Sequence, residues 1–147
     1  MNDPKKQRKY YSGKKKRHTV KTQVIIGTKD FKILKTNFSN GKKHDFRLFK
    51  ESKPLILKDT LVQTDTGYQG IQKIHPNSNI PFKRKRNTKL SKEEKLHNRQ
   101  LASKRIFVEH VIGRLKRFKV ISERYRNRRR RFGLRFNLIA GIYNSEL

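Results

Sequence analysis

The sequence predicts a mixed α/β domain with a small core. Two stretches of alternating or β-branched residues near the N-terminus indicate strands, and apolar patterns with helix caps indicate helices in the second half. The expected order is β-β-α-β-α-α. Leu, Ile, Val and Phe are frequent enough for the 147 residues to fold as one domain, although 35% of them are charged.

The first two strands are predicted to form a hairpin. Residues 19–26 (TVKTQVII) alternate and then become β-branched, and residues 31–38 (FKILKTNF) follow after a turn. Residues 45–52 (DFRLFKES) predict a short helix, because Phe46 and Phe49 are three positions apart. Pro54 should end this helix.

The second half should contain a short strand and two helices. Residues 60–64 (TLVQT) predict a third strand, and residues 75–90, with two prolines and a basic cluster, predict an irregular excursion. Ser91 and Glu94 form an S-x-x-E capping box that opens a long helix over about 91–119. The apolar residues 134–143 predict a terminal helix.

The charge of the chain predicts a polyanionic partner. Forty basic against eleven acidic residues give a net charge of +29, concentrated in residues 1–21, 83–89 and 114–135. Nucleic acid is the leading candidate, followed by an anionic membrane surface. The absence of Cys excludes disulfides and thiolate sites, and no apolar stretch is long enough to span a bilayer. We therefore expect a soluble, cytoplasmic protein without a membrane partner.

Three acidic residues are candidates for a catalytic or metal-binding role, and each also has a simpler structural explanation. Asp65 lies where the third strand meets a Gly-containing turn, but an ordinary turn Asp would look the same. Glu109 lies mid-helix with Arg105 and Lys116 on the same side, but Arg105 and Glu109 could form a surface ion pair. Asp45 follows His44, and capping the short helix is its simplest role.

At these positions the sequence resembles bacterial insertion-sequence transposases of the DDE type. The spacing Arg105-x3-Glu109-x6-Lys116 matches their Y-x2-R-x3-E-x6-K signature, with Ala102 in place of the Tyr. The ordered blocks YYSGKKKRHTVK (10–21), HDFRLFKES (44–52), DTGYQG (65–70) and ERYRNRRRRFGLRFNLIAGIYN (123–144) are also similar to that family. The resemblance covers nearly the whole chain.

The resemblance implies a ribonuclease H-like fold, a mixed sheet flanked by helices, here lacking its first strand. Three acids of this fold bind two divalent ions, Mg²⁺ or Mn²⁺. Asp65 corresponds to the second acid and Glu109 to the third, as catalytic residues and metal ligands. The family's first Asp lies upstream of the YYSGKKK block, and Asp3, which precedes Pro4 in a polar segment, is a poor substitute.

The resemblance also divides the chain and assigns its DNA contacts. Residues 1–17 would be a basic N-terminal arm, and residues 18–147 a partial catalytic domain interrupted by the excursion at 75–90. Arg105 and Lys116 would contact DNA backbone beside the cleaved end. The basic blocks should add sequence-independent affinity for double-stranded DNA. Their proposed DNA-binding residues are Lys14, Lys15, Lys16, Arg17, Arg128, Arg129, Arg130 and Arg131.

Two functions are compatible with these patterns. The first is DNA transposition, the chain being the C-terminal part of a transposase that is truncated or completed by an upstream-encoded half. Partners would be insertion-sequence ends and target DNA, with a homo-oligomer when the protein is complete and a nucleoid-associated location. The chain alone should be inactive because it lacks the first Asp. The alternative is a non-catalytic basic protein or regulator that binds transposon ends.

Overall fold

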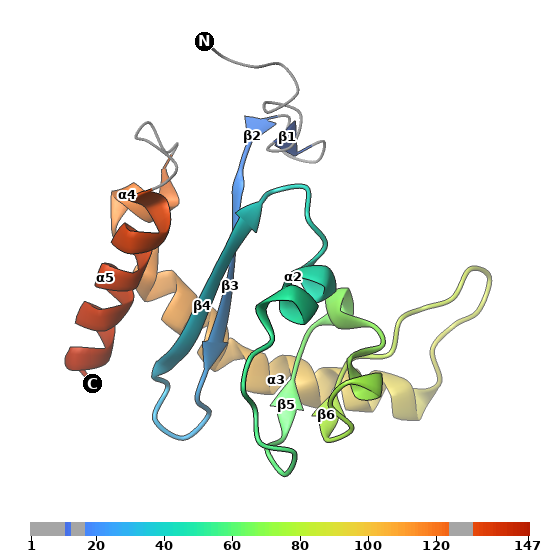
Figure 1. The fold of residues 1–147 in the computed structure, drawn as a ribbon. Coiled ribbons are helices and arrows are strands. Elements are labelled where there is room, and N and C mark those ends of the chain that lie inside the picture. The colour runs from blue at the N-terminus through green and yellow to red at the C-terminus, as the bar shows by residue number, and fades with distance from the viewer. Residues whose placement is uncertain (1–10, 13–16, 124–130) are drawn as a thin grey trace.

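The computed structural model describes residues 11–12, 17–123 and 131–147 and has a mixed α/β architecture (Figure 1). The α/β class predicted from the sequence is therefore confirmed. The strands are β1 (Tyr11–Ser12), β2 (Arg17–His18), β3 (Val20–Ile26), β4 (Ile33–Asn40), β5 (Val62–Gln63) and β6 (Ser78–Asn79). The helices are α2 (Asp45–Ser52), α3 (Lys92–Leu115), α4 (Lys119–Ser122) and α5 (Phe132–Ser145), with 3₁₀ turns η1 (Thr66–Tyr68) and η2 (Ile71–Lys73).

The central feature is the predicted hairpin of β3 and β4, which is confirmed. The two strands pair antiparallel from Val20 opposite Asn40 to Ile26 opposite Ile33, with a register shift between Ile25 and Ile26. The shift leaves Leu34 as an extra residue in β4, so Ile33 faces the same side as Thr36 and Phe38. This face of the hairpin consequently carries the apolar residues Val20, Val24, Ile26, Ile33 and Phe38.

The apolar face of the hairpin packs against α5. Ile33 belongs to one buried cluster with the C-terminal helices, and the ring of Phe38 contacts Phe132 and Phe136 edge to face at 5.9 and 5.5 Å. The side-chain amide of Asn144 accepts a hydrogen bond from the Ile33 N–H (2.8 Å) and donates one to its carbonyl (2.9 Å). These contacts fix α5 along β4.

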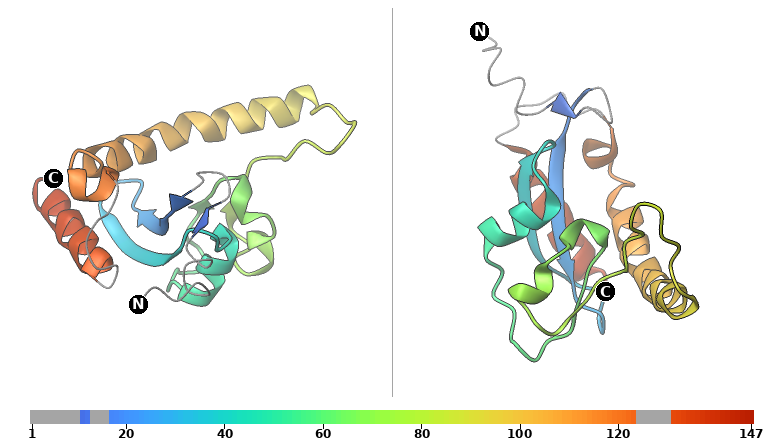
Figure 2. Two further views of the ribbon diagram at one scale, coloured as in Figure 1. Left: turned by 90° about the horizontal axis from the view of Figure 1, so that it is seen from above. Right: turned by 90° about the vertical axis from the view of Figure 1, so that its right-hand side faces the viewer.

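The long helix α3 begins where the sequence predicts. Ser91 accepts a hydrogen bond from the Glu94 N–H, and the Glu94 carboxylate accepts one from the Ser91 N–H, so the capping box is confirmed. The helix runs across the back of the hairpin, where Phe107 stacks on Phe31 with ring centroids 5.1 Å apart (Figures 1 and 2). It ends at Leu115 rather than near residue 119, and the short helix α4 follows.

The strands do not join into one mixed sheet, which differs from the expected arrangement. The described strands form three separate two-stranded sheets: β1–β2, β3–β4 and the parallel pair β5–β6. The predicted strand 60–64 shrinks to Val62–Gln63, because the Thr60 N–H bonds to the Leu57 carbonyl in a turn and Asp65 is already the N-cap of η1. The ribonuclease H-like arrangement thus stays a proposal.

Two segments expected to be irregular contain short strands. Within the predicted basic arm, Tyr11 pairs with His18 in the β1–β2 sheet. Within the predicted excursion 75–90, Ser78 and Asn79 form β6, because the N–H groups of Val62 and Thr64 bond to the carbonyls of Asn77 and Asn79. Residues 80–90 form the irregular loop that projects beyond the start of α3 (Figure 1).

Candidate active site and nucleic-acid interface

Asp65 lies at the carboxyl end of β5, as the sequence predicts. Asp65 is the N-cap residue of η1, and its carboxylate Oδ1 accepts a hydrogen bond from the Gly67 N–H at 2.8 Å. The side chain is half-buried, and the hydroxyl of the preceding Thr64 is buried without a hydrogen-bond partner in the described part of the chain. The turn holds one carboxylate oxygen in place and leaves the other available for a ligand.

Asp45 does not cap α2, which corrects the simplest role given to it. The cap position is occupied by His44, Asp45 is the first helical residue, and no side chain caps the helix. The reason is a tertiary contact: Asp45 Oδ1 lies 3.1 Å from the ammonium of Lys21 on β3. The carboxylate is therefore drawn toward the hairpin and away from the backbone of its own helix.

The Asp45 and Asp65 carboxylates border the same glycine. A Cβ at Gly67 would lie 3.0 Å from Asp65 Oδ1 and 3.2 Å from Asp45 Oδ2. The turn after β5 and the first turn of α2 thus approach each other so closely that a side chain at position 67 would push at least one of the two carboxylates aside by a few tenths of an ångström. Sequence reasoning did not place Asp45 beside Asp65, because 20 positions separate them in the chain.

Tyr68 links this pair of acids to the polar face of the hairpin. The amide of Gln23 on β3 donates a hydrogen bond to the Tyr68 hydroxyl at 2.8 Å. Burial raises the pKa of Tyr68, opposed by the Gln23 hydrogen bond and reinforced by the negative charges of Asp45 and Asp65. Lys21 and Gln23 were not singled out from the sequence. Their alternation with Val20, Thr22 and Val24 is the signal that would have found this face.

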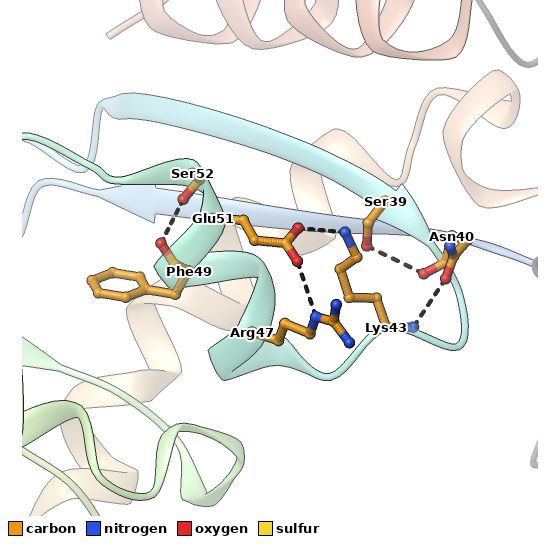
Figure 3. Close-up of polar contacts among 7 residues, drawn as sticks. All are labelled: Ser39, Asn40, Lys43, Arg47, Phe49, Glu51 and Ser52. Carbon is orange, nitrogen blue, oxygen red and sulfur yellow. Dashed lines mark hydrogen bonds and ion pairs between the residues drawn. The ribbon is translucent and has the colours of Figure 1, made fainter.

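A second ion cluster beside the site serves the fold of α2. Glu51 receives hydrogen bonds from the ammonium of Lys43 and from Arg47 Nε, which lies 3.0 Å away (Figure 3). These hydrogen bonds lower the pKa of Glu51 below its ordinary value of 4.5. The cluster ties the loop after β4 to the helix that carries Asp45.

Glu109 lies in the middle of α3 and is exposed. Arg105 is half-buried on the same side, whereas Lys116 is exposed at the C-cap of the helix. Arg105 and Glu109 form no ion pair among the described residues, so the surface-pair explanation of Glu109 is not supported. Ala102, at the signature's Tyr position, is exposed as well.

The described residues do not assemble a complete metal site. Within residues 11–12, 17–123 and 131–147, no group of three or more His, Cys, Asp or Glu side chains is placed to hold a metal ion. Asp45 and Asp65 come together, but Glu109 does not join them in such a group. A site for two divalent ions would need carboxylates beyond those the described residues bring together.

The predicted DNA-binding blocks are only partly covered by the structure. Lys14, Lys15, Lys16, Arg128, Arg129 and Arg130 lie outside the described residues, and of Arg17 only the backbone in β2 is described. Arg131 is exposed at the N-cap of α5.

A further group of basic side chains lies on the loop 80–90. Lys83, Arg84, Lys85, Arg86 and Lys89 are all exposed. The base of the loop is fixed on α3, because Asn98 exchanges two hydrogen bonds, of 2.8 and 3.0 Å, with the Phe82 backbone. The loop therefore presents five cations from an anchored base.

Comparison with known proteins places these residues in a known sequence family. The sequence model of the DDE superfamily endonucleases matches residues 1–144. A curated relative, a probable transposase for insertion sequence element IS702 from Microchaete diplosiphon, is 53% identical over 145 residues, which are 98% of this chain and 52% of the relative. The chain thus spans about half the length of this relative. No solved structure gives a significant match. None of the described helices is long and apolar enough to cross a membrane.

Proposed function

Because the chain belongs to the DDE superfamily endonuclease family, we propose that it is part of a transposase that cuts and joins DNA at insertion-sequence ends. The observation that carries the proposal is Asp65, an acid fixed at a strand end by the Gly67 amide in the middle of the family match. The same block of sequence supplies Glu109 with Arg105 and Lys116 on the surface of α3.

Asp65 and Glu109 are the proposed catalytic residues and metal ligands. Mg²⁺ or Mn²⁺ would polarise the phosphodiester and neutralise the leaving oxygen, and two ions are proposed for the complete enzyme. The described residues do not fit two ions by themselves, because they bring no three acids together. We therefore assign no catalytic step to the isolated chain, and we expect it to be inactive.

The missing acid would come from an upstream-encoded half of the protein. Within the described residues, β3 hydrogen bonds to a strand only along the edge facing β4, and β5 only along the edge facing β6. The Gln23–Tyr68 hydrogen bond links the turn after β5 to the polar face of β3. A strand from the other half, pairing with β3 beside β5, would complete a ribonuclease H-like sheet and place its Asp beside Asp65.

Residues 18–147 would form a partial catalytic domain. DNA would bind across α3 of this domain and along the basic segments of the chain. Arg105 and Lys116 would hold phosphates beside Glu109. The arm over residues 1–17, with Lys14, Lys15, Lys16 and Arg17, the block Arg128–Arg131 and the loop 80–90 would add contacts to backbone phosphates. The complete protein would act on double-stranded DNA as a homo-oligomer in the nucleoid.

One observation favours the second candidate function, a non-catalytic DNA-binding regulator. The described residues combine exposed cations with an incomplete set of acids, and such a chain could occupy transposon ends without cutting them. Binding and cleavage therefore have to be measured separately.

The test is cleavage by the chain alone and by the chain joined to a segment that restores the first strand and its Asp. With Mg²⁺ or Mn²⁺ and DNA carrying the ends of the element, only the extended protein should cut. Asp65→Asn should abolish cutting, whereas Asp59→Asn, at an exposed loop position, should not. Failure of the extended protein to cut, with DNA binding retained, would favour the regulator.

A further inference from the structure

Phe82 lies at the base of the basic loop 80–90 and is held there by its backbone. Its N–H donates a hydrogen bond to Asn98 Oδ1 at 2.8 Å, and its carbonyl accepts one from Asn98 Nδ2 at 3.0 Å. Its ring meets the ring of His97 on α3, with centroids 5.1 Å apart and an angle of 64° between the planes. Phe82 is nevertheless 48% exposed. The loop is therefore anchored by main-chain hydrogen bonds, and the aromatic ring stays accessible from solvent.

The same loop base is tied to the turn that carries Asp65. The side-chain amide of Gln69 donates a hydrogen bond to the carbonyl of Pro81 at 3.3 Å. Gln69 directly follows η1, whose N-cap residue is Asp65. Phe82 is thus placed beside the Asp65 turn through its neighbour Pro81, and beside the early turns of α3 through Asn98.

A run of exposed cations follows Phe82 in the part of the loop that projects beyond the start of α3 (Figure 1). These cations are Lys83, Arg84, Lys85, Arg86 and Lys89. An accessible aromatic ring next to such a run is the combination that binds single-stranded nucleic acid, because the cations neutralise phosphates while the ring stacks on a base. A base inside a duplex is already stacked on both sides. The combination therefore favours DNA in which a base is unpaired.

We propose that Phe82 stacks on an unpaired base of the DNA, with the cations of the loop 80–90 on the flanking phosphates. The inference rests on the proposed function, which brings DNA to the Asp65 turn, and it adds a nucleotide whose base has left the duplex near that turn. Loss of one base–aromatic stack weakens binding by roughly five- to a hundredfold. Because Asn98 already holds the Phe82 backbone, little further ordering of the protein opposes the stacking.

The test compares the affinity of the full chain for two labelled DNAs with the same number of phosphates, by fluorescence anisotropy. One is a fully paired duplex, and the other carries a short internal loop of unpaired thymines. Phe82→Ala should weaken binding to the DNA with unpaired bases by about tenfold and leave the affinity for the paired duplex within about twofold. Phe82→Tyr should bind both DNAs as the wild-type chain does, because Tyr keeps an aromatic ring. Phe82→Leu, which is apolar without a ring, should behave like Phe82→Ala.

Leu96→Ala is the matched control, because Leu96 is an apolar residue of α3 that is 57% exposed and has no ring to stack on a base. This variant should change neither affinity. A salt series then separates stacking from phosphate contacts. Phe82→Ala should lower the logarithm of the affinity for the DNA with unpaired bases by a constant amount at every salt concentration, because the ring neutralises no phosphate.

A second measurement uses the absence of Trp from the chain. Phe82→Trp introduces a single indole at this position, and its fluorescence should be quenched by the DNA with unpaired bases more than by the paired duplex. Leu96→Trp should show no such difference between the two DNAs.

Equal weakening of both affinities by Phe82→Ala, or an unchanged affinity for the DNA with unpaired bases, would overturn the stacking proposal. Either result would leave DNA binding, and with it the proposed function, intact. A wild-type chain that bound neither DNA would contradict the proposed function as well as this inference.

Discussion

At the scale of single residues, the main feature is the placement of two acids around Gly67. Asp65 is held by the Gly67 N–H, and Asp45 is held by Lys21, so both carboxylates have fixed partners before any ligand binds. Tyr68 and Gln23 extend this polar group onto β3. Fixed carboxylates cost little reorganisation when a cation arrives, which suits the proposed role of Asp65.

We predict that Gly67→Ala displaces Asp65. The added Cβ would lie 3.0 and 3.2 Å from the two carboxylates, so at least one must move by a few tenths of an ångström. Cleavage by the extended protein should fall by about tenfold or more, and the amide resonances of residues 65–68 should shift. Gly141→Ala is the control, because a Cβ there meets no atom within 4 Å. Unchanged cleavage by Gly67→Ala would contradict the tight fit.

We predict from the raised pKa of Tyr68 that the stability of the protein depends on pH. Because its pKa is raised above the ordinary value of 10.0, the folded protein holds the phenolic proton more tightly than the unfolded chain does. This contribution to the free energy of unfolding is fully present below pH 10 and is lost as the pH rises through the raised pKa. The stability difference between the wild-type protein and Tyr68→Phe, measured by urea unfolding, should therefore shrink above pH 10. A stability difference between the two proteins that does not change with pH would contradict this prediction.

At the scale of elements, a side chain of α5 takes the place of a neighbouring strand at the end of β4. The Asn144 amide satisfies both the N–H and the carbonyl of Ile33, which is 8% exposed. The bulge near Ile33 makes this possible, since it turns that residue toward the helix. The apolar cluster around Phe132, Phe136 and Phe38 then packs along the same line. The helix and hairpin thus form one unit.

Removing the Asn144 amide should destabilise this unit. Asn144→Ala leaves a buried backbone donor and acceptor without partners, at a cost of about 2–3 kcal/mol in the free energy of unfolding. Asn137→Ala is the control, because Asn137 bonds to Thr36 at an exposed position, and removing that bond should cost about 1 kcal/mol or less. Equal destabilisation of the two variants in urea unfolding would contradict the structural role of Asn144.

The start of α3 gives a second prediction at this scale. Ser91→Ala removes the side-chain half of the capping box and should cost about 1 kcal/mol in the free energy of unfolding, judged by chemical denaturation. Ser103→Ala, at an exposed position inside the same helix, should be neutral or slightly stabilising because Ala has the higher helix propensity. If both substitutions behaved alike, the cap would contribute nothing.

At the scale of the whole molecule, charge dominates behaviour in solution. Glu51 is occupied by Lys43 and Arg47, so it does little to neutralise the cations of the loop 80–90. A net charge of +29 should attract DNA strongly and with little sequence preference. Affinity should therefore fall steeply with salt.

The loop 80–90 should contribute measurably to that salt dependence. Replacing Lys83, Arg84, Lys85 and Arg86 with Gln should make the slope of log affinity against log salt shallower by about 0.9 for each DNA phosphate that the loop no longer neutralises. A control replacing Lys50, Lys53, Lys58 and Lys73, which are exposed around α2 and β5, removes the same charge. If fluorescence titrations gave the same slope for both variants, net charge rather than the anchored loop would account for binding.

The features that depend only on neighbouring residues could be predicted from the sequence. Alternation and β-branching specified the β3–β4 hairpin, Ser91 and Glu94 specified the start of α3, and Pro54 marked the end of α2. The position of Asp65 at the end of a strand followed from the Gly turn beside it, and ordered sequence blocks indicated the family that the family match confirmed. All of these features depend on residues close together in the chain, so they can be predicted from a single sequence.

The features that join distant parts of the chain became visible only in the three-dimensional structure. Asp45 contacts Lys21 and borders Gly67 beside Asp65 instead of capping its helix, because the fold places the ammonium of Lys21 3.1 Å from its carboxylate. The separation of the β3–β4 and β5–β6 sheets could not be predicted either, because the sequence pattern of a strand does not specify the strand with which it pairs. The exposed residues Leu134, Leu138 and Ile142 of α5 cannot be distinguished from core residues in the sequence. Only the position of the hairpin shows which side of that helix stays exposed.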